Sequence, residues 1–491
     1  MSLEEFTHEE KNVRDILPPH LLSCKYDLFN EINDSANKAK EKYGNYLWPL
    51  SDLEHLELYF NLIKNACDNK KMIIKNLLNN EVIESDIYFI TNLYHDGDYN
   101  FVFNYYYEKE NIVLGLVSGS GVTGLSINVA YMIYFNEKKI FHFDLIVVNT
   151  YTHAYYLPKI KEIIETIDID KINSENSRIT TLEGYNTGLH HACCIFLNGI
   201  YIMETIGIKN NIDELIIGGH DAFLIEEYYK NKYPEINIVK GLSPNELVGK
   251  VCKGVIFKYG HYHVTNNCAE FIKSYIQKVM PLREEYKHEI EFVKNNFYPV
   301  FSVNLRCVSC EIKNQADTIS ETINKLKTLY PRAFFYIGGY IGDYNDDLLN
   351  KIGQIIGGGS GSYGDTLNAY QKTFEDIKSK LTHEDFKSIL NLKINNILAF
   401  IENVHFSINM NAGYTCLETV LNNIPSIYFG TKWNYHNRNL FYVSKQNYKE
   451  PVFIEEPDIK FLTENIYDPI TCEISSDTLV NLVFEHESFF S

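Results

Sequence analysis

The second part of the chain alternates between short apolar runs and longer amphipathic segments, and this alternation restricts the fold more than any other feature. From about residue 177, strand-like runs such as RITTLEGY, ELIIGG and INIVKG are separated by helix-like runs such as HDAFLIEEYYKNKY. A second series begins at PVFSVNLR and continues through AFFYIGGY to IPSIYFG. Strands that are spaced by helices are typical of parallel sheets. The sequence therefore predicts two doubly wound α/β units in tandem.

The first 176 residues have a different pattern. Residues 1–84 show helical periodicity, as in LEHLELYFNLIKNACD. From there to about residue 149, short runs rich in Tyr, Phe, Ile and Val alternate with turn-forming stretches such as HDGD and SGSG, which is typical of an antiparallel sheet. We therefore expect an N-terminal α+β module over residues 1–176, a first Rossmann-like domain over 177–292 and a second over 293–491.

Charge and composition restrict the partners and the compartment. The chain of 491 residues carries 64 acidic against 45 basic side chains, which argues against duplex nucleic acid or an anionic bilayer as the main partner. The N-terminal stretch MSLEEFTHEEKNVRD lacks the apolar centre of a secretory signal, and ACCIFLNGIYIM is too short to span a membrane. Ten cysteines without regular spacing indicate thiols in a reducing compartment. We expect a cytoplasmic protein, with peripheral membrane association left open.

The stretch NMNAGYTCLETVLNNIP, residues 409–425, lies between two strand-like runs and carries the strongest functional signal. In a doubly wound sheet, a glycine and the first turn of the next helix offer backbone amides to a phosphate, so we assign that role to Gly413, Tyr414 and Thr415. Glu418 lies about one turn further along. Its carboxylate has the geometry to accept hydrogen bonds from two neighbouring ribose hydroxyls.

This stretch resembles the nucleotide-sugar motif in the C-terminal domain of the GT-B glycosyltransferases. The positions that match the spacing of the motif are Gly413, Leu417, Glu418 and Pro425, with Asn423 where a glycine is usual. Retaining members carry a glutamate where this chain has Met410, so the resemblance implies an inverting enzyme. The strand after the helix, IPSIYFGTKW, is also similar to that of the bacterial heptosyltransferases.

The resemblance implies two Rossmann-like domains that face a cleft, with a nucleotide sugar bound by the second domain. It covers residues 395–435 by motif and 177–491 as a fold, and it does not extend to residues 1–176. The donor diphosphate would need cations, and Arg306 ends the first strand of the second domain. Lys432 and Arg438, in TKWNYHNRN, are further candidates. A surface ion pair is the plain alternative for Arg306.

Inverting transfer needs a general base for the acceptor hydroxyl. In this fold the base comes from the first Rossmann domain, commonly after its first strand, where GYNTGLHH places His190 and His191 at the start of a helix. Histidine titrates near neutral pH, which suits a base, although it also commonly caps or packs such helices. The choice between the two stays open. Asp221 and its neighbour His220, after ELIIGG, are the next candidates, followed by His261 and His263.

No metal site and no cofactor beyond the nucleotide-sugar substrate are expected. Asp96 and Asp98 lie in a HDGD stretch, where turns favour Asp regardless of function, and Asp168 and Asp170 precede a polar linker. The glycine-rich segment GGGSGSYGD, residues 357–365, lacks the Lys and Ser/Thr of a phosphate-binding P-loop, so a mobile loop is the preferred interpretation.

Together, these features predict a metal-independent glycosyltransferase that moves a sugar from a nucleotide donor to a glycan, lipid or protein acceptor with inversion. Two alternatives remain. A nucleotide-sugar epimerase of the same fold would turn over the donor without an acceptor. A non-catalytic carbohydrate-binding or scaffold protein would bind sugar without nucleotide affinity. The sequence does not specify the donor, the acceptor, the oligomeric state or the role of the N-terminal module.

Overall fold

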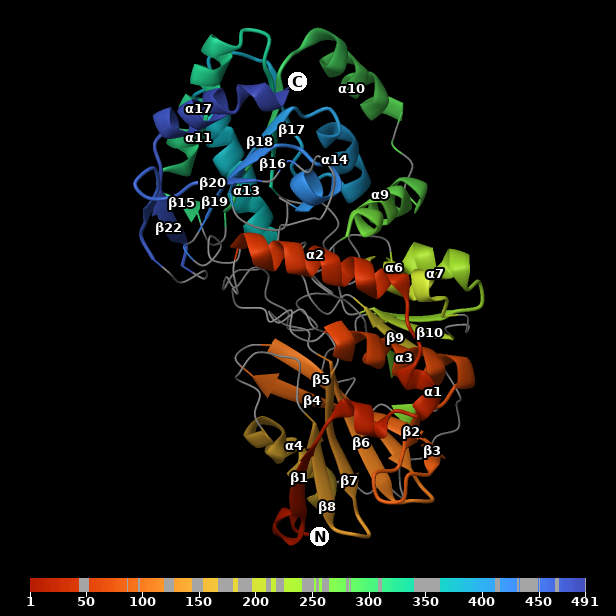
Figure 1. Cartoon of the computed structure of the whole chain (residues 1–491). Helices are drawn as coiled ribbons and strands as arrows, with labels where there is room; N and C mark the ends of the chain where they lie inside the picture. The colour runs from red at the N-terminus through yellow and green to blue at the C-terminus, as the bar shows by residue number, and fades with distance from the viewer. Residues whose placement is uncertain are drawn as a thin grey trace.

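The computed structural model places a parallel sheet with its helices at one end of the molecule and an antiparallel sheet at the other, with a smaller parallel sheet between them (Figure 1). The structure describes residues 1–43, 53–85, 87–95, 98–118, 128–143, 153–166, 180–183, 197–208, 213–217, 225–240, 251–252, 256–257, 265–279, 282, 284–307, 311–339, 363–410, 416–430, 432, 449, 451–463 and 468–490.

The C-terminal sheet has six strands, all parallel, in the order β17-β16-β14-β18-β19-β20. In chain order they are β14 (Val300–Asn304), β16 (Phe334–Gly338), β17 (Phe386–Ser388), β18 (Phe406–Met410), β19 (Ser426–Phe429) and β20 (Val452–Phe453). Numbered along the chain, this order is 3-2-1-4-5-6, the order of a Rossmann sheet. The predicted second doubly wound sheet is therefore present.

Helices cover both faces of this sheet. One face packs its apolar side chains against α11 (Gln315–Leu329), α13 (Tyr363–Lys378) and α17 (Ser476–Glu485). The other face packs against α14 (Ile394–Ile401) and a short π-helical segment, η7 (Cys416–Leu421). Both faces are buried, and every residue of β14, β16 and β19 is buried, the polar ones included. A small separate sheet, β15 (Glu311–Ile312), β22 (Ile470–Glu473) and β21 (Lys460–Phe461), lies beside these elements.

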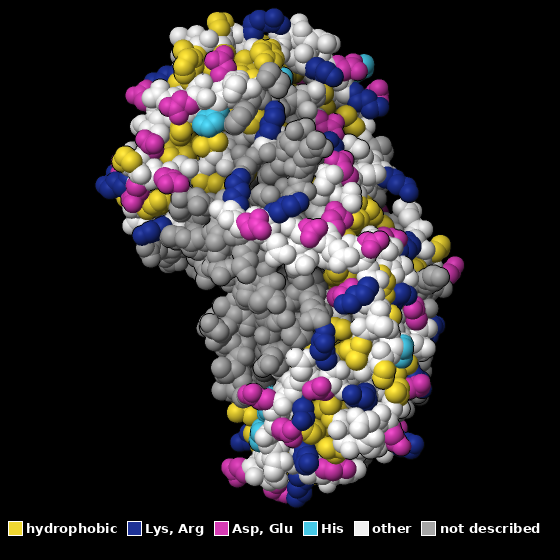
Figure 2. All heavy atoms as spheres, in the orientation of Figure 1, with side chains coloured by type: hydrophobic (Ala, Val, Ile, Leu, Met, Phe, Trp, Pro, Cys, Tyr) yellow, Lys and Arg dark blue, Asp and Glu magenta, His cyan; other side chains and the backbone are white. Residues whose placement is uncertain are grey.

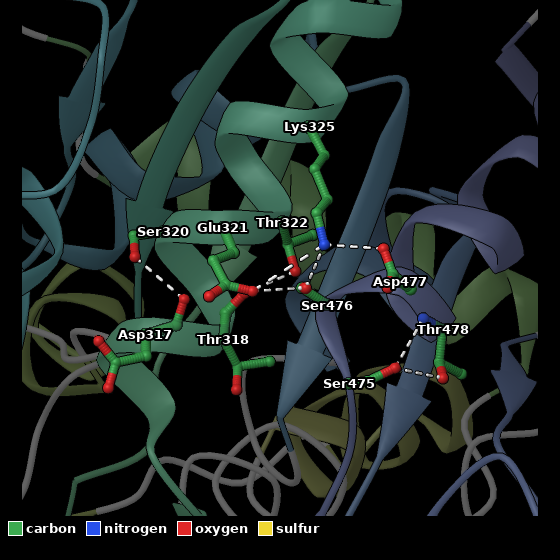
Figure 3. Close-up of polar contacts among 10 residues, drawn as sticks. All are labelled: Asp317, Thr318, Ser320, Glu321, Thr322, Lys325, Ser475, Ser476, Asp477 and Thr478. Atoms are coloured by element: carbon green, nitrogen blue, oxygen red, sulfur yellow. Dashed lines mark hydrogen bonds and ion pairs between the residues drawn. The ribbon is translucent and has the colours of Figure 1, made fainter.

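A polar clamp joins α11 to the start of α17 (Figure 3). The ammonium of Lys325 donates to Ser476 Oγ and to Asp477 Oδ1, both at 2.7 Å. The hydroxyl of Ser476 donates to Glu321 Oε2 at 2.8 Å. Ser475 caps the helix, since its Oγ accepts from the backbone amide of Thr478 at 3.1 Å. The clamp thus fixes two helices that cover the same face of the sheet.

The first parallel sheet is smaller, with the order β11-β10-β9-β13. Its strands are β9 (Thr180–Glu183), β10 (Glu214–Ile217), β11 (Asn237–Lys240) and β13 (Ile256–Phe257), and the helices that follow in the chain are α6 (Asn198–Ile206) and α7 (Ile225–Lys232). All three pairings are parallel. The order is 3-2-1-4, the first part of the same Rossmann pattern, so the sequence prediction of two α/β units is confirmed at the level of sheet order.

The N-terminal sheet is largely antiparallel, as predicted, and has the order β1-β8-β7-β6-β5-β4-β12. Its meander consists of β4 (Ile87–His95), β5 (Asp98–Tyr107), β6 (Ile112–Ser118), β7 (Asn128–Tyr134) and β8 (Lys139–Phe143). Two edge strands differ from expectation. A strand within the segment expected to be helical, β1 (Thr7–Lys11), pairs parallel with β8. From beyond residue 177, β12 (Val251–Cys252) pairs antiparallel with β4.

Helices α1 (Pro19–Leu22), α2 (Asp27–Tyr43), α3 (Leu53–Asn69) and α4 (His153–Glu165) complete this part, with a small hairpin of β2 (Ile73–Lys75) and β3 (Val82–Glu84). The α2 helix crosses the middle of the molecule in Figure 1. On the face shown in Figure 2, basic and acidic side chains are interspersed.

Two further helices, α9 (Asn266–Val279) and α10 (Glu284–Asn296), connect the two parallel sheets. The α9 helix contacts α6 of the first unit and also α14 and η7 of the second. At the end of α14, Glu402 Oε1 accepts from Gln277 Nε2 at 2.8 Å and lies 3.4 Å from Lys273 Nζ. One continuous group of buried apolar side chains runs through these contacts, including Leu215 of β10 and Tyr428 of β19. The described parts of the two units therefore share a core.

No helix within the described ranges is both long enough and apolar enough to cross a bilayer.

Candidate functional site

The topology of the C-terminal sheet identifies one edge as the candidate site. From β14 the chain winds to one side, through β16 and β17, and then returns to β18 on the other side of β14. In open α/β sheets, ligands bind outside the carboxyl ends of the strands at such a switch point. Here the two strands end at Asn304 and Met410. In the chain, β14 is followed by Arg306, and β18 is followed by the predicted phosphate-binding residues 413–415.

Polar side chains line this end of both strands inside an apolar layer. Ser302 pairs with Ser407 and Asn304 with Asn409 in the register of β14 and β18. Paired residues of neighbouring strands point to the same face, which here is the face under η7. All four side chains are buried. With Glu418 they form the switch-point cluster: Ser302, Asn304, Ser407, Asn409 and Glu418.

Glu418 lies on η7 and its side chain is 0% exposed. Its Oε2 accepts a 2.9 Å hydrogen bond from Asn304 Nδ2 and a second from the hydroxyl of Ser407. Asn304 Nδ2 also donates to Asn409 Oδ1. The other oxygen, Glu418 Oε1, is enclosed and has no hydrogen-bond partner in the structure as described. One carboxyl oxygen of Glu418 thus joins the helical segment to two strands.

Burial raises the pKa of Glu418 above the usual range of a glutamate. The charged form of Glu418 is favoured by four neighbouring polar side chains, Ser302, Ser407, Asn304 and Asn409. Two of these groups, Ser302 Oγ and Asn409 Nδ2, do not complete hydrogen bonds of normal geometry. Desolvation is therefore the larger influence. Burial thus disfavours the ionised carboxylate, whereas the two hydrogen bonds to Oε2 can be accepted by either form of the carboxyl group.

Asn423, just after η7, has a left-handed backbone conformation, with a φ of 55°. Glycine adopts this region freely and asparagine tolerates it better than most residues. The side-chain oxygen of Asn423 also accepts from the backbone amide of Lys449 at 2.7 Å. An asparagine therefore suits the turn that leads from η7 to β19.

The backbone of Arg306 is held in place by one buried side chain. Its amide donates to Gln315 Oε1 at 3.0 Å, and its carbonyl accepts from Gln315 Nε2 at 2.8 Å. Gln315 begins α11 and is 5% exposed. A two-point contact of this kind fixes the peptide on either side of Arg306.

Ionisable groups surround Arg306. Burial raises the pKa of Glu311 to about 6, while the charge of Arg306 acts in the opposite direction. Burial also raises the pKa of Tyr370, which lies on α13 beside the same arginine. The thiol of Cys307 has its pKa raised to about 12 by burial and is therefore an unreactive thiol at neutral pH.

The carboxyl end of β16 approaches this site closely. Gly339 has a φ of 130°, and a Cβ atom there would lie 2.4 Å from the carbonyl oxygen of Leu305 and 3.0 Å from Tyr370 Cε1. Only glycine fits such a position. The ends of β14 and β16 are thus packed backbone to backbone directly beside Arg306.

The residues predicted from sequence fall into two groups. The structure describes Arg306, which it places at the carboxyl edge beside Gln315, and Glu418, which it places beneath that edge with its carboxyl group facing the strands. It also describes Lys432, which is partly buried. The others lie outside the described residues: His190, His191, Asp221, Gly413, Tyr414, Thr415 and Arg438. Their roles stay predictions, as does the contact of Glu418 with a ribose.

Sequence reasoning missed the polar partners of Glu418. A signal was present, because the tetrapeptides FSVN (301–304) and FSIN (406–409) have the same pattern in two strands. In the structure, these tetrapeptides pair residue for residue. Within the described ranges, no group of three or more His, Cys, Asp and Glu side chains is arranged to hold a metal ion.

The comparisons with known proteins give structural similarity only. No family model and no curated protein sequence matches the chain. Among solved structures, E. coli heptosyltransferase WaaC with ADP shares 9% identity and a TM-score of 0.31, covering 64% of this chain and 98% of that one. A family 9 glycosyl transferase from Veillonella parvula shares 9% identity, with a TM-score of 0.34 and coverage of 65% and 99%. The UDP-GlcNAc 2-epimerase of Methanocaldococcus jannaschii, in complex with UDP-GlcNAc and UDP, shares 13% identity, with a TM-score of 0.26 and coverage of 61% and 75%.

Proposed function

We propose that this protein is a glycosyltransferase of the GT-B type that transfers a sugar from a nucleotide-sugar donor with inversion and without a metal ion. The observation that carries the proposal is the switch point between β14 and β18. The donor diphosphate would lie at this edge, against Arg306 and the amides of residues 413–415. Arginine supplies two parallel donors to a phosphate group, and the first turn of a helix adds favourable partial charge. Lys432 and Arg438 are further cations for the same group.

The chemistry would be a single displacement at the sugar carbon. The acceptor oxygen forms the new bond as the bond to the diphosphate breaks, the acceptor proton passes to a base, and the negative charge develops on the diphosphate. His190 or His191 is the proposed base, with Asp221 next in order. Met410 ends β18 where retaining relatives carry a carboxylate, so the donor sugar would have no glutamate at this position. This supports inversion.

A thermal-shift screen tests the proposal. The panel contains ADP, UDP, GDP, CDP and dTDP with their common nucleotide sugars, each at millimolar concentration. A ligand present at 100 times its Kd stabilises the native state by about 2.7 kcal/mol, which raises the unfolding midpoint by several degrees. We expect at least one diphosphate and one of its sugar derivatives to do so. No shift with any of them would contradict the proposal.

Turnover of the donor that binds then separates the three functions. With a glycosyltransferase, release of the nucleoside diphosphate from the donor rises when a mixture of glycan, lipid and peptide acceptors is added. An epimerase would convert the donor sugar without any acceptor. A scaffold protein would bind carbohydrate with neither release nor conversion. Either of the last two results would overturn the assignment of transferase activity.

A further inference from the structure

The switch-point cluster has a geometry that does not suit a carboxylate which binds a ligand directly. A carboxylate that recognises two ribose hydroxyls must present its oxygens to the ligand. Glu418 is fully buried, and Oε2 is already occupied by Asn304 and Ser407. To reach a ribose, the side chain would have to break these two hydrogen bonds. The buried donors of Asn304 and Ser407 would then lack this acceptor, which is costly in an apolar layer.

The same geometry suits a residue that positions others. Asn304 lies two residues before Arg306 on the chain, and Ser407 lies in the strand that leads to residues 411–415. Glu418 follows those residues and bonds to both strands. Any shift of η7 relative to β14 would therefore move η7 relative to Arg306, which follows β14.

We propose that Glu418 is a positioning residue, which joins η7 to the ends of β14 and β18 through Asn304 and Ser407 and thereby sets the position of Arg306 relative to η7. This inference rests on the proposed function, because it takes Arg306 as part of the diphosphate site. Both hydrogen bonds of Glu418 are accepted by one oxygen, Oε2, and the side-chain oxygen of glutamine can accept both. Glutamine therefore preserves the role, whereas alanine removes it.

Ser426 provides a matched control. It pairs with Ser407 on the next strand, β19, and is buried on the same face. Its Oγ has no hydrogen-bond partner in the part of the structure that is described. Ser407→Ala and Ser426→Ala thus remove the same atom from the same environment, but only the first removes a contact to Glu418.

The test is a thermodynamic cycle measured by isothermal titration calorimetry. The ligands are ADP and UDP, each paired with its 2′,3′-dideoxy counterpart. Wild type is compared with Glu418→Gln, Glu418→Ala, Ser407→Ala and Ser426→Ala. Measurements are made well below each unfolding midpoint, which is determined first.

We expect Glu418→Ala and Ser407→Ala each to weaken nucleotide binding about 10-fold. The factor should be the same for the ribose and the dideoxy nucleotides, because the effects of independent sites add. Glu418→Gln and Ser426→Ala should bind within about twofold of wild type. If Glu418→Ala does not fold, Ser407→Ala and Glu418→Gln still decide the question.

Two results would overturn the inference while leaving the proposed function intact. In the first, Glu418→Gln loses as much affinity as Glu418→Ala. In the second, the loss disappears when the ligand lacks its ribose hydroxyls, which would show direct contact with the ribose. Failure of the wild type to bind either diphosphate would instead contradict the proposed function and remove the ligand site on which this inference depends.

Discussion

The side-chain amide of Asn304 donates a 2.9 Å hydrogen bond to Glu418 Oε2, and this bond connects a central strand of the C-terminal sheet, β14, to η7. Both side chains are buried, so the bond is made in an apolar layer where an unpaired polar group is costly. Truncating either side chain to alanine would therefore leave the other partly unpaired.

The first prediction concerns this bond. Asn304→Ala removes a donor to Glu418 and leaves a void, so we expect the protein to lose about 1–3 kcal/mol of stability. Thermal unfolding followed by circular dichroism measures the change. Ser426→Ala removes a buried hydroxyl that bonds to nothing in the described structure, and it should be neutral or slightly stabilising. Equal losses in the two variants would contradict the assigned hydrogen bond.

The second prediction concerns Gly339. An alanine there would place its Cβ against the backbone of Leu305 at a φ of 130°, which side chains rarely adopt. We expect Gly339→Ala to cost about 2–4 kcal/mol, which combines backbone strain with a steric clash. Gly207→Ala is the control, because Gly207 has a φ of 68° and no atom within 4 Å of the added Cβ. It should cost only about 1 kcal/mol, as measured by chemical denaturation. A harmless Gly339→Ala would exclude the close approach of β14 and β16.

The third prediction concerns pH. The pKa of Glu311 is raised to about 6 in the folded protein, against about 4.3 in an unfolded chain. The folded state then binds the extra proton more tightly, so this group favours folding at low pH, and its contribution is lost as the pH rises through about 6. Because the side chain is partly exposed, we expect a difference of only about 1 kcal/mol.

Unfolding midpoints measured from pH 4.5 to pH 7.5 check this sign. Relative to the variant Glu311→Gln, the wild type should lose stability as the pH increases across the interval. Parallel curves for the two proteins, or a wild type that gains stability relative to the variant, would contradict the burial of this carboxyl group.

The fourth prediction concerns the clamp shown in Figure 3. Ser476 is 6% exposed and bonds to Glu321 and Lys325, so Ser476→Ala should cost about 1–2 kcal/mol. Asp477 bonds to the same lysine but is exposed, so Asp477→Asn should cost at most about 1 kcal/mol. Neither change should alter nucleotide affinity. A larger cost at Asp477 than at Ser476 would show that exposed charge, not the buried hydroxyl, holds the two helices together.

The parallel arrangement of the C-terminal sheet could be anticipated from the sequence because strands such as β14 and β16 are separated by amphipathic helices such as α11. In contrast, β12 has two residues, and its partner β4 lies far away in the chain. So short a segment has no periodicity, and its pairing depends on tertiary contacts. The β1 strand could not be predicted either, because its sequence THEEK is polar and exposed and pairs at the edge of the sheet.

The site was predictable in part. The spacing of Gly413, Glu418 and Pro425 directed attention to the edge of the sheet at which β18 ends, because a strand, a turn and a helix follow one another there. The burial of Glu418 could not be read from that spacing. It depends on which face of β14 and β18 carries Ser302 and Ser407, and hence on the register between strands more than 100 residues apart in the chain.

The binding of a nucleoside diphosphate at the switch point is tested most directly by calorimetry on one pair of arginine variants. Arg306 lies at the carboxyl edge of the sheet, whereas Arg332 lies at the amino end of β16 and donates to the carbonyl of Asn296 at 3.0 Å. Arg306→Met should weaken the binding of ADP or UDP at least about 10-fold, while Arg332→Met should leave it within about twofold. Equal affinities for wild type and Arg306→Met, or an equal loss in both variants, would contradict a diphosphate site at this edge.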